Sequence, residues 1–168
     1  MAGAFKRVGG RIRVRLGPQE AEVLRNLPDQ LRGVLTAEQV PVGQPDPLTA
    51  RLFPPAYRDA ADRDREQDYH SLVHDDLLNA KLANLDLMAA TLERGSAGRR
   101  RWTVDLTEEE AMAWLGVLND LRLALGVRLG IEEDFDGRVD ESDPSAPAMH
   151  LLAYLGWLEE LLVETLSA

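Results

Sequence analysis

Cysteine is missing from this 168-residue sequence. Within these residues the chain therefore has no disulfide, no thiolate nucleophile, no cysteine-held iron–sulfur cluster and no thiol redox switch. Long apolar runs are missing too. None reaches the roughly 18 residues that a membrane-spanning helix needs, and the N-terminus lacks the apolar core of a signal peptide. These absences predict a cytoplasmic protein without a membrane span.

Positive charge is scarce overall but concentrated at the N-terminus. The formal net charge is −10, from 19 lysines and arginines against 29 acidic residues. Because nucleic-acid binding depends on basic side chains that neutralise phosphates, this balance disfavours nucleic acid as the main partner. Residues 1–16 nevertheless carry five basic residues and no acidic one, whereas residues 132–143 are rich in aspartate and glutamate.

The size and composition of the chain fit one globular domain. A domain of about this length buries roughly 70% of the surface that its unfolded chain exposes. The hydrophobic fraction is 45% and the charged fraction 29%, which is ordinary for globular proteins. We therefore expect a single domain over residues 1–168 that needs no metal or disulfide to hold its core, and we predict no cofactor.

An antiparallel hairpin is predicted at the N-terminus. Residues 4–8 and 11–16 flank Gly9 and Gly10, and a Gly-Gly pair supplies the positive φ angles of a two-residue turn. The second arm alternates strictly between apolar and basic side chains: Ile12, Val14 and Leu16 against Arg11, Arg13 and Arg15. Residues 101–106 alternate in the same way and predict a third strand, since a two-stranded ribbon alone is marginally stable.

Four segments have apolar residues at helical spacing. They cover residues 18–36, 60–94, 108–130 and 146–166. Pro28 predicts a break in the first helix near residues 27–29. Thr107 and Glu110 form a capping box that marks the start of the third.

Two segments between these helices predict loops, at residues 37–50 and 132–146. The predicted fold is therefore α+β and mostly α. It has four or five helices around a helical core, with a small antiparallel sheet on one side.

The segments AWLGVLNDLRLALGVRLGI (113–131) and RLFPPAYRD (51–59) resemble those of an actinobacterial family of unknown function. Its genes often lie beside that of the proteolytic adaptor ClpS, and the order of elements is similar over essentially the whole chain. The resemblance implies no enzyme activity. Some members are described as oxidative-stress regulators that act with a sigma factor and sense redox state through a cysteine pair. Since this chain has no cysteine, thiol sensing does not carry over, and a partner-binding regulatory role remains.

His70 and His74 are a candidate metal site. They lie one turn apart on the predicted helix over residues 60–94, beside several aspartates. Two histidines at this spacing bind zinc when a carboxylate completes the site, but the pattern lacks the glutamate of the metalloprotease motif. The alternative, which we favour, is two partly exposed histidines on a charged helix face.

Asn119, Asp120 and Arg122 interrupt an otherwise apolar helix. They either present a polar cluster to a partner or pair with other helices inside the protein. Because a lone buried charge is costly, we favour pairing, for example between Arg122 and an acid of the helix over residues 60–94.

Arg11, Arg13 and Arg15 are candidates for binding phosphate or an acidic partner, and β-ribbons also enter DNA grooves. If the strand over residues 101–106 pairs with the hairpin, three further arginines join the same patch: Arg99, Arg100 and Arg101. The alternative is a solvated sheet face balanced by acids elsewhere, which is the more frequent outcome for such a pattern.

No Ser/His/Asp pattern, phosphate loop or dinucleotide fingerprint is present. We therefore predict a non-enzymatic regulatory or adaptor protein that acts through contacts with a protein partner, alone or as a homodimer. The resemblance adds stress-linked transcription as its setting. One alternative is a nucleic-acid-binding protein that uses the arginine ribbon. Another is a metal-binding protein at His70 and His74, or an enzyme without a recognisable signature.

Overall fold

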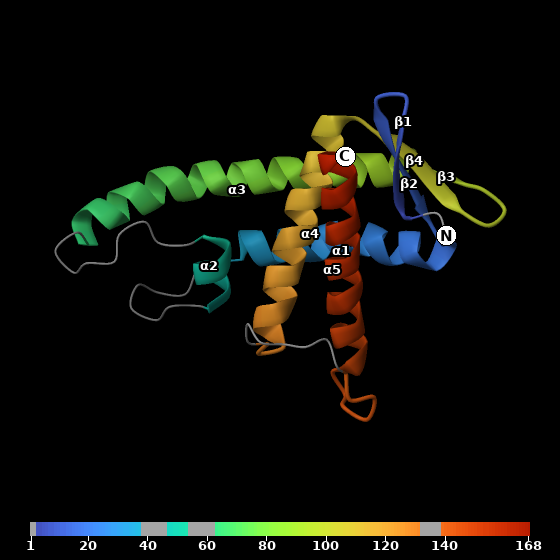
Figure 1. Ribbon diagram of the computed structural model, residues 1–168. Helices are drawn as coiled ribbons and strands as arrows, with labels where there is room; N and C mark the ends of the chain where they lie inside the picture. The colour runs from blue at the N-terminus through green and yellow to red at the C-terminus, as the bar shows by residue number, and fades with distance from the viewer. Residues whose placement is uncertain (1–2, 38–46, 54–62, 132–138) are drawn as a thin grey trace.

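The computed structural model describes residues 3–37, 47–53, 63–131 and 139–168, and within α3 it describes side chains from residue 74 onward. Four long helices, one short helix and a small sheet make up this part of the chain (Figure 1). In chain order the elements are β1 (Phe5–Val8), β2 (Arg11–Leu16), α1 (Pro18–Thr36), α2 (Pro47–Leu52), α3 (Arg63–Arg94), β3 (Ser96–Ala97), β4 (Trp102–Leu106), α4 (Glu108–Arg128) and α5 (Ala146–Ser167). The prediction of a mostly α, α+β fold is confirmed.

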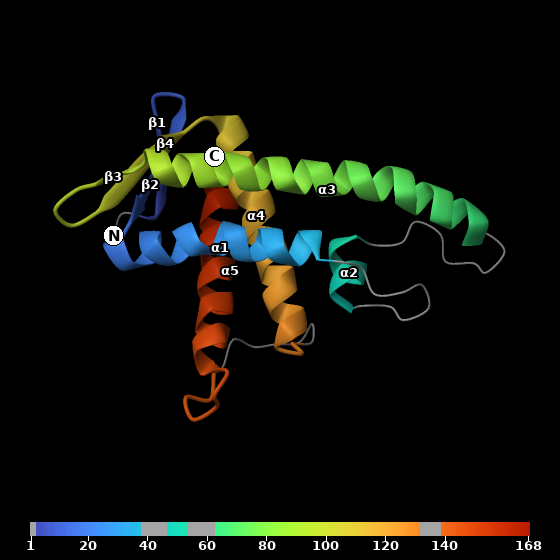
Figure 2. The same cartoon turned by 180° about the vertical axis from the view of Figure 1, so that it is seen from behind.

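The long helices form two crossed pairs. Helices α1 and α3 lie side by side, and α4 and α5 cross them, as the front and back views show (Figures 1 and 2). The sheet lies at the end of this body where α1 begins and α3 ends. None of the described helices is long and apolar enough to cross a membrane.

The sheet has the strand order β1-β2-β4-β3, and every neighbouring pair is antiparallel. Gly9 and Gly10 both have positive φ angles, 55° and 78°, as the predicted two-residue turn requires. Strand β4 pairs with β2 so that Ile12 lies opposite Leu106 and Leu16 opposite Trp102. These four side chains are buried, which confirms the predicted apolar side of the hairpin and its third strand.

Helix α4 connects the sheet with the rest of the core. Its Trp114 is fully buried, meets Phe5 of β1 edge to face, and donates a 2.8 Å hydrogen bond from Nε1 to Oγ1 of Thr91 in α3. The predicted capping box begins this helix: the Glu110 amide donates to Thr107 Oγ1, and the Thr107 amide donates to Glu110 Oε2, both at 3.1 Å. The indole of Trp114 therefore joins α4 to β1 and to α3.

Two predictions about helices are wrong. Helix α1 is continuous from Pro18 to Thr36, with no break near residues 27–29. Pro28 is itself buried with Leu24, Leu27 and Leu31, so packing on the core holds the helix across the missing amide donor. The end of the predicted loop over residues 37–50 is also helical, because Pro47 begins α2; residues 38–46 lie outside the described residues.

Candidate functional site: the basic face of the sheet

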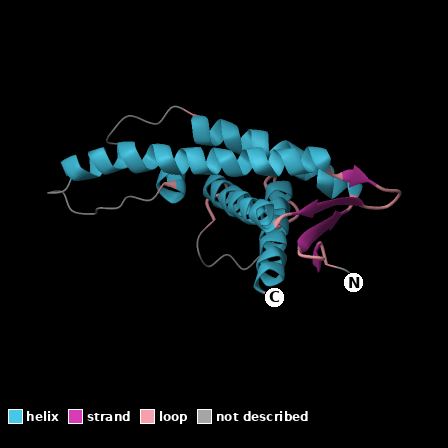
Figure 3. Cartoon of the chain, turned by 90° about the horizontal axis from the view of Figure 1, so that it is seen from above, coloured by secondary structure: helices cyan, strands magenta, loops and turns pink. Residues whose placement is uncertain are grey.

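The face of the sheet opposite the core is the candidate functional surface. Strand alternation places eight strand residues there, which we call the basic face: Lys6, Val8, Arg11, Arg13, Arg15, Ser96, Thr103 and Asp105. The helices pack against the other face, as the view from above shows (Figure 3). Four cationic side chains and one anionic side chain give the basic face a net charge of +3, in a chain whose net charge is −10.

Arg13 and Asp105 form the fixed centre of this face. They lie directly opposite each other in the β2–β4 register, and the guanidinium donates from Nε to Oδ1 at 2.7 Å and from Nη2 to Oδ2 at 3.0 Å. This bidentate hydrogen bonding lowers the pKa of Asp105 and raises that of Arg13. The other three cations of the face, Lys6, Arg11 and Arg15, are exposed and have no ion-pair partner among the described residues.

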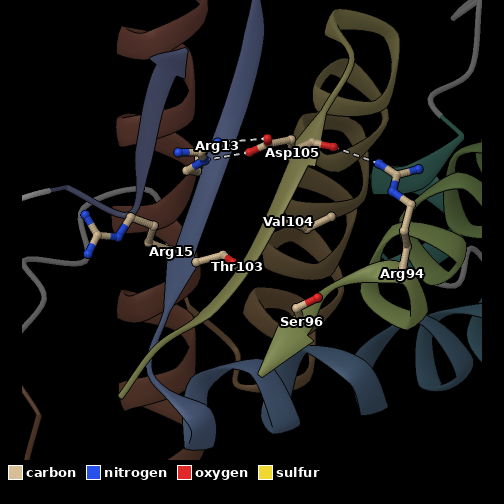
Figure 4. Close-up of a pocket in the computed structure, with 7 residues that line it drawn as sticks. All are labelled: Arg13, Arg15, Arg94, Ser96, Thr103, Val104 and Asp105. Carbon is tan, nitrogen blue, oxygen red and sulfur yellow. Dashed lines mark hydrogen bonds and ion pairs between the residues drawn. The ribbon is translucent and has the colours of Figure 1, made fainter. Parts of the chain in front are cut away.

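A shallow cavity of about 480 Å³ lies over β4 beside this pair (Figure 4). It is lined by Arg13, Arg15, Arg94, Ser96, Thr103, Val104 and Asp105. Three arginines and one aspartate give the lining a net charge of +2. The cavity therefore favours an anionic occupant.

Arg94 closes the outer edge of β4. Strand β3 pairs with only Trp102 and Thr103, and beyond it the Arg94 guanidinium donates from Nη2 to the Asp105 carbonyl at 2.8 Å. The same guanidinium donates to both carboxylate oxygens of Glu110, at 3.0 and 2.7 Å, which lowers the pKa of Glu110. Sequence reasoning missed Arg94, because its role depends on where α3 ends relative to β4, and no local pattern carries that information.

The arginines of the turn between β3 and β4 extend the basic face. The sequence predicts that these arginines join the face if the strand over residues 101–106 pairs with the hairpin, and β4 does pair with β2. Arg99, Arg100 and Arg101 are exposed, and the Gly98 amide donates to the Arg101 carbonyl at 2.8 Å to close the turn. Arg101 lies two residues before Thr103, so alternation places both on the same face.

Asn119, Asp120 and Arg122 do not form one cluster. Asp120 is only 5% exposed and accepts two hydrogen bonds from Nζ of Lys81 in α3, at 2.8 and 3.0 Å. Arg122 donates to Oε2 of Glu159 in α5 at 2.6 Å, so the predicted partner on α3 is wrong. Asn119 is exposed. Helices α3 and α5 each supply an ion-pair partner to α4: Lys81 of α3 pairs with Asp120, and Glu159 of α5 pairs with Arg122.

Of the two histidines of the candidate metal site, the structure describes the side chain of His74. Its ring lies 4.2 Å from that of Phe53, centroid to centroid. His70 belongs to α3, but its side chain lies outside the described residues. Within the described part of the chain, no three histidine, aspartate or glutamate side chains group as metal ligands. Metal binding at the two histidines stays a prediction.

Comparisons with known proteins confirm the resemblance drawn from the sequence. A family model described as a domain of unknown function, DUF2017, matches residues 2–166. The oxidative stress regulator AosR of Mycobacterium tuberculosis is 30% identical over 188 aligned positions, which cover 94% of this chain and 83% of that protein. The putative oxidative stress regulator AosR of Mycobacterium leprae is 30% identical over 189 positions, covering 95% and 84%. No solved structure matches. The chain belongs to the DUF2017 family.

Proposed function

We propose that this chain is a regulator in an oxidative-stress response and that it acts by binding an acidic protein partner on the basic face. The observation that carries the proposal is the cluster of unpaired cations Lys6, Arg11 and Arg15 on an exposed sheet face of an acidic chain. The relatives named as oxidative stress regulators support the regulatory setting.

Charge complementarity explains how such a face selects a partner. The strongly negative remainder of the chain repels other acidic surfaces, so an acidic partner is attracted to one orientation. Arginine guanidinium groups bind carboxylates through two parallel hydrogen bonds, which adds direction to the attraction. The Arg13–Asp105 pair holds the centre of the face rigid and leaves Arg11 and Arg15 available on either side.

The chemistry of the cavity supports a non-enzymatic role. Ser96 and Thr103 supply hydroxyl groups, but the described residues that line the cavity include no histidine to activate them. The lining carboxylate, Asp105, has a lowered pKa and both its oxygens accept from Arg13, so it is a poor base. Because these residues include no cysteine, no thiol among them senses the redox state.

The test is affinity capture of the tagged chain from a lysate of its own host after nuclease treatment. The variant Arg11→Glu/Arg15→Glu removes two unpaired cations and leaves the Arg13–Asp105 pair intact. The control Arg51→Glu/Arg128→Glu makes the same charge change at two exposed positions outside the face. We expect one protein to be retained by the wild type and the control and lost by the variant.

Equal retention by both double variants would place the contact elsewhere. Retention of nucleic acid alone, lost with Arg11 and Arg15 and weakened steeply by salt, would replace the protein partner with the DNA-binding alternative.

A further inference from the structure

One row of the basic face carries polar groups that the fold leaves unused. The sheet register places Arg15 opposite Thr103 and Thr103 opposite Ser96, so the three residues occupy one row across β2, β4 and β3. Directly opposite residues in such a row have Cβ atoms about 5 Å apart. All three line the cavity over β4, and none of their side chains bonds to another described residue.

Fixed cations border this row. Arg13 uses Nε and Nη2 on Asp105, which leaves its Nη1 without a partner among the described residues. Arg94 approaches from the other side of β4 (Figure 4). In the same view the Arg15 guanidinium extends away from Thr103. Since the Arg15 side chain is exposed and makes no hydrogen bond to a described residue, it can rotate toward the cavity within nanoseconds.

We propose that this cavity binds a phosphate-type oxyanion. Guanidinium groups are pure donors and hydroxyl groups can donate, whereas the oxygens of a phosphate only accept when it is fully ionised. The lining carboxylate does not oppose an anion strongly, because Arg13 neutralises it on both oxygens. Arg15 binds two phosphate oxygens as a fork, and Thr103 and Ser96 donate to the others.

The size of the cavity sets the kind of phosphate. The cavity is shallow and open to solvent, and its volume of about 480 Å³ exceeds what a single phosphate group fills. The cavity therefore has room for the substituent of a phosphate monoester as well as for free phosphate. This inference does not depend on the acidic protein partner proposed above, because it concerns a ligand of the isolated chain.

The experiment titrates the purified chain at constant ionic strength with inorganic phosphate and, separately, with O-phosphoserine. Calorimetry gives the dissociation constant, and amide chemical shifts of Ser96 and Thr103 locate the ligand. Arg15→Gln is the test variant. Arg11→Gln is its matched control, because Arg11 lies on the same strand and face, is exposed, and does not line the cavity.

We expect saturable binding that Arg15→Gln weakens by about tenfold and that Arg11→Gln changes by less than about twofold. Thr103→Val, which keeps the shape of the side chain, should weaken binding while leaving the melting temperature nearly unchanged. Binding of both probes assigns a monoester site, and binding of inorganic phosphate alone assigns a site for free phosphate.

Two results would overturn the proposal. One is equal weakening by Arg11→Gln and Arg15→Gln, which would show general attraction to a charged face. The other is the absence of saturable binding of either probe at millimolar concentration. Capture of an acidic protein through Arg11 and Arg15 is compatible with either result, so the two proposals fail separately.

Discussion

Gly95 stands so close to the indole of Trp102 that a Cβ atom added to the glycine would lie 1.9 Å from Cζ2 of the ring. The glycine links α3 to β3, and Trp102 opens β4 with its side chain fully buried. This contact lets the last turn of α3 approach the sheet closely enough for Arg94 to reach the Asp105 carbonyl. The packing at Gly95 therefore positions one wall of the cavity.

Gly95→Ala should lower the free energy of unfolding by about 2 kcal/mol, because the added methyl group forces the indole or the helix end to move. Gly33→Ala is the control. Gly33 lies in the last turn of α1 with open space where its Cβ would be, and there alanine should stabilise the helix by up to about 1 kcal/mol. Urea unfolding followed by circular dichroism measures both. Equal effects of the two substitutions would contradict the close packing at Gly95.

Asp120→Ala should cost about 3 kcal/mol, since it leaves the ammonium of Lys81 largely buried without its carboxylate. Arg122→Ala should cost less than Asp120→Ala, because the Arg122 side chain is 42% exposed and water screens its ion pair, although the Glu159 carboxylate left behind is only 17% exposed. Thermal melts of the two variants separate the cases. If the double variant Lys81→Met/Asp120→Leu is as unstable as Asp120→Ala, the loss reflects packing and not an unpaired charge.

Acid stability should depend on Glu110. Its pKa is lowered in the folded protein by the hydrogen bonds from Arg94, so its contribution is complete above the unfolded pKa of about 4.3 and is lost as the pH falls through the lower folded value. Glu110→Gln keeps an acceptor for the Thr107 amide and should cost about 1 kcal/mol at pH 7, a figure reduced for the partial exposure of Arg94. The difference from wild type should shrink between pH 5 and pH 3.

The matched variant is Glu109→Gln, which removes the neighbouring exposed carboxylate. It should leave the pH dependence of stability close to that of the wild type. If the stability of Glu110→Gln depended on pH as that of the wild type does, the contact between Arg94 and Glu110 would not stabilise the folded state.

Arg7 ties the sheet to the end of the last helix. Its guanidinium donates to the carbonyls of Thr165 and Leu166, which have no acceptor role within the helix ladder, at 3.1 and 3.2 Å. Arg7→Gln should raise amide hydrogen exchange in the last turn of α5 about fivefold. Lys6→Gln, on the opposite face of β1, should leave that exchange unchanged. Equal exchange rates for the last turn of α5 in the wild type, Arg7→Gln and Lys6→Gln would contradict a stabilising role for the Arg7 hydrogen bonds.

Local patterns were sufficient to predict much of the fold. The alternation of β2 and the Thr107–Glu110 capping box depend on neighbours in sequence, so both were predicted correctly. Pro28 was misjudged because tertiary packing outweighs the loss of one amide donor. The start of α2 was missed because proline was counted only as a breaker, although Pro47 stands at the first position of a helix, where it is favourable.

The candidate site was only half predictable from the sequence. Alternation identified Arg11, Arg13 and Arg15 on one face. It could not show that Arg13 is occupied by Asp105 while the other two are unpaired, because that depends on the register of a strand about ninety residues away. The same limit hid the cavity, since Arg94 and Ser96 reach it from the end of a helix and a two-residue strand.

The pairing of Ile12 with Leu106 also has a consequence during synthesis. At ordinary translation rates the ribosome needs roughly 5–20 s to make the residues between these strands, and during that time the apolar side of the hairpin has no partner. Such a ribbon is prone to pair with other nascent chains. Arg11, Arg13 and Arg15 oppose this pairing, because two such ribbons joined edge to edge would bring their arginine side chains close together. The charges that we assign to ligand binding in the finished protein protect the same strand before the protein is complete.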